Sequence, residues 1–514
     1  MKRNESNNLF ELICEMTKSE KRFFKLSTQK HYNKSGNVYI KLFNRIESQK
    51  EYNEKNITEY FKNESWIKRI HIEKYNLYKI LLRTLNDYHY GMTVDNQITE
   101  GILNAKILYS KMLYVQAYKV IKTVKNLAIK FDKYPLLLEI LETERNCLYS
   151  LPGQGIVEKE LPLLYKESKQ AIEIFKDLTN YIGLFKDIMI EKKMYFTARN
   201  KTEKQRLQKI LKGFDKRDKY EESTFEADIR KNNLLSLYSV ASGNIKDGYK
   251  YSTKVIKKFE KNPDRIQENP ERYVTNLYNL IMRCDLLKKK SESELYSDKV
   301  INIYSQYKIK ENRIVNYLTM RLEMYKVNRC IRYTEINEGY KLINEIEDWL
   351  KKKNKLINSE TEILFYYNAA YLFFIGNELK KALGYVNKIL NKNKQNYRSD
   401  VFGFTRILNL IIHYKLGNTD LLTYVIKSTY RFWKKNKILN KTELVIYKYM
   451  NSILLKVNDF KELTVVLNEL KKELIIIFKD PFEARAVEFF DIISWIDSIL
   501  EKKPFVEILR RNAN

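Results

Sequence analysis

The sequence predicts an all-α protein, from its composition and from a repeated pattern of helices and turns. Only 14 of the 514 residues are Gly and only 7 are Pro, while 44% are hydrophobic and 31% are charged. Gly and Pro normally account for roughly 7% and 5% of residues, so this scarcity argues against many-turned β-sandwiches, Gly-rich phosphate loops and long flexible linkers. The longest apolar windows fall short of the ~20 residues that cross a bilayer, so we expect no transmembrane span.

The first part of the chain, residues 1–98, predicts a separate helical module. Apolar side chains within Leu9–Met16 trace one helical face, and a second helix is expected to begin at Ser19. Further helices are expected over Val38–Ile46 and Ile70–Leu85.

Residues 99–505 predict an array of helix hairpins. In each copy a turn residue is followed five positions later by a small residue, which lets the second helix pack close to the first. Turns are expected at Met112, Gly243, Lys290, Thr334, Gly376, Gly417 and Asn458. The small residues are Ala117, Gly248, Gly339 and, one position late, Ala382. From Gly243 onward the turns lie 41–47 residues apart, which is longer than a 34-residue tetratricopeptide unit.

This pattern resembles the tetratricopeptide-like superfamily of helix-hairpin repeats. The resemblance implies an α-solenoid, a superhelical array of about eight to ten antiparallel hairpins with a long concave surface for partners. The alternative is that any amphipathic helix pair joined by Gly-Asn gives the same pattern, and the chain is all-α in either case. The Ser-Glu-Lys-Arg-Phe-Phe-Lys-Leu stretch at Ser19–Leu26 resembles uncharacterised helical-repeat proteins of Bacteroidota, which implies no activity. Residues 506–514 are expected to form a C-terminal tail.

The sequence contains no motif that predicts catalysis or the binding of a metal or cofactor. None of the four His has a partner at the spacing of a metal site, and the phosphate-loop and nucleophile-elbow motifs are missing. Four widely separated Cys without a Cys-x-x-Cys pair predict reduced thiols. Asn4–Asn8 follows the basic Lys2 and Arg3 where a signal peptide would be apolar. We therefore expect a cytoplasmic, non-enzymatic protein.

The leading functional hypothesis is an interaction scaffold that binds a protein or peptide segment in the groove of the array. It rests on analogy with the fold. The candidate groove residues, all Tyr or Asn, are Asn276, Tyr278, Asn279, Tyr366, Tyr367, Asn368 and Tyr371. Tyr and Asn supply amphipathic contact and adaptable hydrogen bonds. The alternative is that they are hairpin packing residues.

The competing hypothesis is binding of RNA, DNA or a ribonucleoprotein such as the ribosome. The 94 Lys and Arg exceed the 64 Asp and Glu by 30, and such a surplus attracts polyanions. The candidate residues are Lys204, Arg206, Lys209, Lys212, Lys216, Arg431, Trp433, Lys434, Lys435 and Lys437, with Trp433 available for base stacking. The alternatives are a solvated helix face, Lys that complement a helix C-terminus, and an AT-rich codon bias. A third hypothesis is a peptide-sensing regulator with the N-terminal module as its output.

Overall fold

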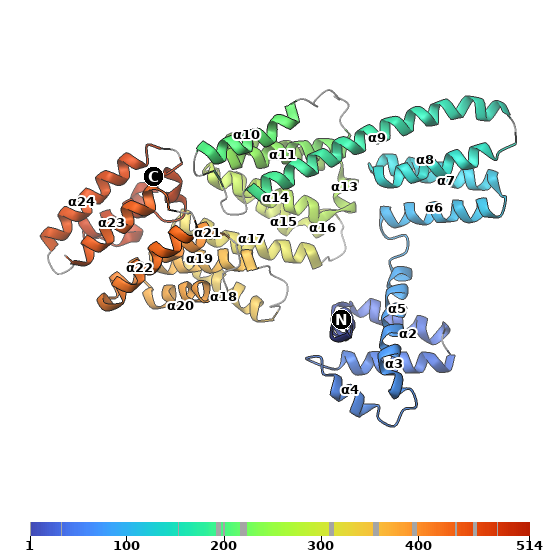
Figure 1. Cartoon of the computed structure of the whole chain (residues 1–514), viewed down its shortest axis with the longest axis horizontal. Coiled ribbons are helices and arrows are strands. Elements are labelled where there is room, and N and C mark those ends of the chain that lie inside the picture. The colour runs from blue at the N-terminus through green and yellow to red at the C-terminus, as the bar shows by residue number, and fades with distance from the viewer. Residues whose placement is uncertain are drawn as a thin grey trace. The chain divides into compact units, whose positions relative to one another are not determined.

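The computed structural model describes residues 2–31, 33–152, 154–191, 197–198, 201–215, 224–307, 313–352, 359–392, 398–436, 439–455, 460–480 and 482–513. These residues are helical almost throughout and include no β-strand, which confirms the predicted all-α class (Figure 1). None of the described helices is both long enough and apolar enough to cross a bilayer. The chain forms two compact units, residues 1–173 and residues 174–514.

The first unit begins with five α-helices, α1 to α5, that share one core. Its helices are α1 (Lys2–Glu15), α2 (Lys18–His31), α3 (Asn33–Glu47), α4 (Glu54–Tyr60), the 3-10 helix η1 (Ile67–Arg69), α5 (Ile70–Tyr88), α6 (Val94–Ser110), α7 (Tyr114–Lys130), α8 (Tyr134–Tyr149) and the first part of α9 (Gln154–Glu191). Leu9, Ile13, Phe24 and Phe43 are buried together, so the apolar faces expected from the sequence form this core. Helix α4, which the sequence analysis missed, contributes only Ile57 from within its own bounds.

The second unit consists of consecutive helix hairpins. After α9 its helices are α10 (Lys201–Asp215), α11 (Phe225–Ser242), α12 (Ile245–Glu260), α13 (Pro263–Glu268), α14 (Pro270–Leu286), α15 (Lys290–Ile301), α16 (Ile303–Tyr307), α17 (Arg313–Arg332), α18 (Ile336–Lys352), α19 (Ser359–Ile375), α20 (Leu379–Leu390), α21 (Ser399–Lys415), α22 (Thr419–Lys435), α23 (Lys441–Leu455), α24 (Phe460–Ile477), the 3-10 helix η2 (Ala484–Glu488), α25 (Ile492–Leu500) and α26 (Phe505–Ala513). Helices α17 and α18, α19 and α20, and α21 and α22 pack as pairs. The first helices of neighbouring pairs also touch, α14 with α17, α17 with α19 and α19 with α21.

The hairpin turns share one backbone motif. The residues with positive φ at these turns are Met112, Gly243, Lys288, Thr334, Asn377 and Gly417. At each turn the N–H of the next residue donates to the carbonyl five positions back, as Glu335 does to Cys330 at 2.9 Å. This is the Schellman arrangement that ends many helices with a left-handed residue. Four of these residues are not Gly, so the chain makes its turns with few Gly residues.

A buried residue follows each of these six left-handed residues after five positions. In five of the turns it is small, namely Ala117, Gly248, Ser293, Gly339 and Ala382. A Cβ atom on Gly339 would lie 2.3 Å from Cδ2 of Leu372, so the helices there approach too closely for a larger side chain. The turn expected at Gly376-Asn377 is confirmed with Asn377 as its left-handed residue, and the turn expected near Lys290 has its left-handed residue at Lys288. Ala382 therefore has the ordinary spacing.

The corrected turns at residues 243, 288, 334, 377 and 417 lie 45, 46, 43 and 40 positions apart. The turn expected at Asn458 lies outside the described residues.

The C-terminal segment, residues 484–513, packs against the other helices of the second unit. Phe490, Trp495, Ile496 and Phe505 are all nearly fully buried in the core that α17–α24 form. Residues expected as a tail belong to helix α26, where Ile508 is 1% exposed. This segment therefore becomes part of the surroundings of α17 and α19.

Candidate functional site

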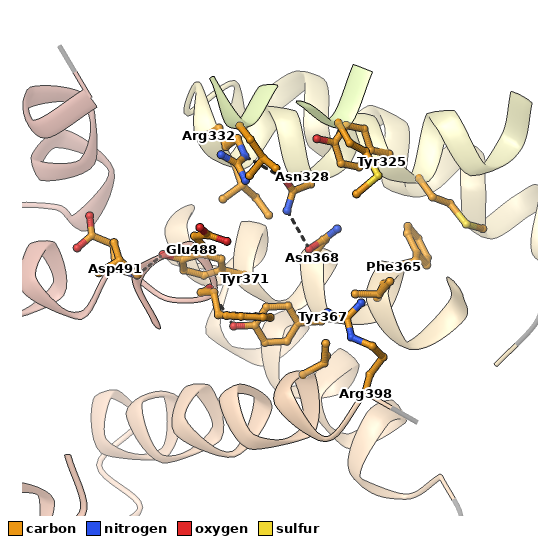
Figure 2. A pocket seen from close by; sticks show the side chains of 18 of the residues that line it. Tyr325, Asn328, Arg332, Phe365, Tyr367, Asn368, Tyr371, Arg398, Glu488 and Asp491 are labelled. Atoms are coloured by element: carbon orange, nitrogen blue, oxygen red, sulfur yellow. Dashed lines mark hydrogen bonds between the residues drawn. The ribbon is translucent and has the colours of Figure 1, made fainter. Parts of the chain in front are cut away.

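Helices α17 and α19 present matching rows of side chains to one cavity. The row on α17 is Arg321, Met324, Tyr325, Asn328 and Ile331, and the row on α19 is Thr361, Leu364, Phe365, Asn368 and Tyr371, each 40 positions later. Steps of three and four residues keep each row on one helix face. Asn328 Nδ2 donates to Asn368 Oδ1 at 3.4 Å, which joins the fourth residues of the two rows (Figure 2).

The cavity between these rows has a volume of about 340 Å³. Helix α14 adds a third wall through Tyr278, Met282 and Leu286. The C-terminal segment closes a further side through Val487, Glu488, Phe489, Asp491, Leu509 and Asn512. The volume lies at the lower end of the roughly 300–1,000 Å³ range of ligand pockets. The cavity therefore fits a compact ligand, or a short part of a longer one.

Two tyrosines on α19 hold the main chain of the C-terminal segment. The Tyr367 hydroxyl donates to the Phe489 carbonyl at 3.0 Å, and the Asp491 N–H donates to the Tyr371 hydroxyl at 3.1 Å. The ring of Phe489 stacks on Phe404 of α21 at 4.5 Å between centroids. These contacts fix one cavity wall to the helices that form the others.

Further along, Arg510 Nε donates to the Thr334 hydroxyl at 3.2 Å. This bond ties α26 to the turn between α17 and α18.

One end of the cavity is lined by two arginines that flank Tyr278. The Arg321 guanidinium lies 4.8 Å from the centroid of the Tyr278 ring. Arg398 Nε donates to Asp400 at 2.9 Å, and the left-handed φ of 48° at Arg398 immediately precedes α21. Burial raises the pKa of Tyr278, and the charges of Arg321 and Arg398 oppose that rise.

The other end carries charges of both signs. Arg332 Nε donates to Asn328 Oδ1 at 3.2 Å, and Figure 2 shows Arg332 on the same side of the view as Glu488 and Asp491. Asp491 is the N-cap of α25, since its carboxylate accepts bonds from the N–H and the hydroxyl of Ser494 at 3.0 and 2.6 Å. Around Tyr278, by contrast, both nearby carboxylates, Asp400 and Glu360, pair with Arg398, and Arg321 pairs with no described carboxylate.

Two ionisable groups lie buried on α14. Burial lowers the pKa of Arg283 to about 10. Burial raises the pKa of the Asp285 carboxyl, although Ser293, Tyr325 and the guanidinium of Arg332 oppose the rise. Tyr325 thus lies between a buried carboxyl and the cavity.

The structure brings four of the seven predicted groove residues together. Tyr278, Tyr367, Asn368 and Tyr371 line the cavity.

The other three do not line the cavity, because neighbouring helical positions point in different directions. Tyr366 donates to Glu362 at 2.8 Å on another face of α19. Asn276 is buried and donates to the Arg272 carbonyl at 2.8 Å. The carbonyl of Asn279 accepts a bond from Arg283, and its side chain is not part of the lining.

The predicted polyanion residues lie on two helices. The side chains of Lys204, Arg206, Lys209 and Lys212 on α10 and of Arg431, Lys434 and Lys435 on α22 are exposed, and Arg206 pairs with Glu191 at 2.9 Å. Lys216 and Lys437 lie outside the described residues. Trp433 is fully buried, so the expectation that its ring is available for base stacking was wrong. Trp433 follows Ile426 by seven residues, so both side chains lie on the inner face of α22, and this spacing could have indicated that Trp433 is buried.

Sequence reasoning missed the arginines and the α17 row. The detectable signal was Met324-Tyr325 followed by Asn328, which recurs 40 positions later as Leu364-Phe365 followed by Asn368. No local sequence pattern indicated that the C-terminal segment forms a wall of the cavity.

These features define a class of protein: an all-α chain of paired helices that surrounds a ligand-sized cavity. No protein-family model, curated protein or solved structure matches the chain.

Proposed function

We propose that the chain is a non-enzymatic scaffold whose cavity binds a peptide segment of a partner protein. We also propose that its hairpins form a tetratricopeptide-like superhelical array. The main support for the array is the 40-residue correspondence between the cavity rows of α17 and α19. The Schellman turns followed after five positions by a small residue agree with it.

Two observations favour a peptide as the ligand. Asn368 accepts a hydrogen bond through its side-chain oxygen, whereas its amide nitrogen has no partner among the described residues and can donate to a peptide carbonyl. Tyr367 and Tyr371 already bind main-chain groups of the C-terminal segment, so this surface has the chemistry to bind an irregular backbone.

The test places a photo-crosslinking amino acid at Met324, which lines the cavity, and at Tyr424, which is 70% exposed on α22, in separate variants. We expect a discrete crosslinked protein from Met324 only. Replacing Asn368 with Phe, which fills the cavity, should abolish that crosslink. Asn468→Phe on the exposed face of α24 should leave it unchanged. The same crosslink from Tyr424, or its persistence in the Asn368→Phe variant, would contradict the proposal.

Polyanion binding is the second candidate. It is favoured by Lys204, Lys209 and Lys212, which are exposed and form no ion pair with any described carboxylate. Binding of single-stranded RNA through them should weaken steeply with salt, and reversing all three charges should lower the salt slope by about 2. RNA binding that the triple reversal leaves unchanged would exclude this surface. The peptide-sensing regulator stays a hypothesis.

A further inference from the structure

We infer that the cavity recognises an acidic side chain of its peptide ligand at the end formed by Arg321, Tyr278 and Arg398. This inference rests on the proposed peptide-binding function and names the chemistry of the ligand. The observation behind it is a guanidinium that lines the aromatic cavity and has no carboxylate partner among the described residues.

Arg321 is the guanidinium at this end that is left for an incoming anion. It stacks against Tyr278, yet it forms no ion pair with any carboxylate in the part of the chain that the structure describes. Arg398 is 12% exposed, and its Nε and Nη2 atoms are both bonded to Asp400, at 2.9 and 3.0 Å. Its remaining nitrogen, Nη1, lies 4.0 Å from Glu360. A carboxylate entering here would pair with Arg321, because Arg398 is already paired with Asp400 and Glu360.

The other charged groups around the cavity have partners or lie at its far end. Arg332, at the far end, donates through Nε to Asn328 and lies in the field of the buried Asp285. The carboxylate of Asp400 accepts from the N–H of Val401 at 2.8 Å in addition to Arg398, and Asp491 caps α25. Glu488 lies on the C-terminal wall, where Figure 2 shows it away from Arg398. The attraction for an anion is therefore concentrated at the Arg321 end.

The helix spacing sets where the acidic residue falls in the ligand. Asn328 follows Arg321 by seven residues, which is about 10 Å along the axis of α17. Asn368 lies beside Asn328, so its free amide donor is about 10 Å from Arg321 along the helix axis. An extended peptide rises about 3.3 Å per residue. The acidic side chain should therefore lie about three residues from the carbonyl that Asn368 binds.

The probes are two pools of N-acetylated, C-amidated hexapeptides, one with Glu and one with Gln fixed at the second position and with mixtures elsewhere. The blocked ends remove the terminal charges, so any negative charge on a peptide comes from a side chain. Affinity selection on the full chain should enrich the Glu pool. For an enriched peptide, replacing Glu with Gln should weaken binding by about 10- to 100-fold in calorimetry, as expected for a hydrogen bond to a charged group.

Arg321→Gln should weaken binding of the Glu peptide by the same factor and leave binding of the Gln peptide unchanged. The reason is that Glu-to-Gln in the peptide and Arg321→Gln in the protein each remove the same carboxylate–guanidinium pair. Arg321→Lys keeps the charge without the planar guanidinium and should give an intermediate loss. The matched control is Arg145→Gln on α8, an exposed arginine paired with Glu142 at 3.1 Å, which should change nothing. Unfolding curves of each variant separate lost recognition from lost folding.

Three results would overturn the inference. Equal binding of the two pools, with no effect of Arg321→Gln, would contradict the proposed anion site but not the proposed peptide binding. Binding of adenosine monophosphate in place of peptides, lost in Arg321→Gln, would overturn both proposals in favour of a nucleotide. No binding by either pool would overturn the acidic-peptide inference alone, because the Met324 crosslink tests the partner independently.

Discussion

The hydrogen bond between Tyr371 and the C-terminal segment leads to a specific prediction. Removing the hydroxyl of Tyr371 in Tyr371→Phe deletes the acceptor of the Asp491 N–H, which it binds at 3.1 Å. Tyr371 is 6% exposed and its bond to Asp491 is partly buried, so the freed N–H is only partly open to water. The ring itself, which packs 5.4 Å from Phe490 between centroids, keeps its shape and volume.

The magnitude follows from the cost of an unpaired buried donor, which is about 1–3 kcal/mol. If the segment opens as a unit, that cost lowers its opening free energy and raises the opening equilibrium by about 5- to 150-fold. The Asp491 carboxylate continues to cap α25, so helix α25 itself should persist. The effect should be confined to the segment and the edges of the cavity.

Hydrogen exchange followed by mass spectrometry measures this equilibrium directly. Peptides covering residues 484–513 should exchange at least fivefold faster in Tyr371→Phe, while peptides from α11 and α12 should not change. The matched control is Tyr366→Phe, because that hydroxyl donates to Glu362 on its own helix. Unchanged exchange of the segment in Tyr371→Phe, or equal acceleration in Tyr366→Phe, would refute the reasoning.

Three further predictions concern stability. Gly339→Val forces a side chain against Leu372 and should lower the free energy of unfolding in urea by about 1–3 kcal/mol. Gly384→Val is the control, since nothing lies within 4 Å of its Cβ position, and an equal loss there would contradict the packing argument. Burial acts to raise the pKa of Glu226, but Arg272 and Arg230 outweigh it, so the pKa lies below its ordinary 4.5. The stability from these pairs is present above pH 4.5 and is lost as the pH falls through the folded-state value, so Glu226→Gln should flatten stability against pH in that acidic range. The pKa of Asp285 is raised by burial, so its charge opposes folding above its ordinary 3.8, and Asp285→Asn should be more stable than the native chain in urea at pH 7. A less stable variant would show that the charge is favourable.

The hairpins were predictable because they depend on local requirements. A Schellman turn needs a left-handed residue, and close helix contact needs a small residue five positions later, so Gly243 with Gly248 gave a clear signal. Lys288 did not, because a lysine rarely adopts positive φ and sequence alone gives no reason to place one there. The turns were thus located to within two residues.

The cavity was less predictable because it depends on which helix face points inward. Tyr366 and Tyr367 are adjacent and chemically identical, yet about 100° of helical rotation separates them and only Tyr367 lines the cavity. The wall formed by Phe489 comes from 122 positions further along the chain, where no periodicity indicates contact with α19. Arg321 could be recognised only after the rows of α17 and α19 were aligned.

The wall formed by the C-terminal segment also affects when the site comes into being during protein synthesis. Chains emerge from the ribosome N-terminal end first, and helices begin to pack as they emerge. Helices α14, α17 and α19 are made well before residues 487–512, so we expect the nascent chain to have an incomplete groove, lined partly by aromatic and aliphatic side chains, until those residues arrive. Binding competence should therefore appear only after residue 512 has been released, and prematurely terminated chains should expose the groove to chaperones.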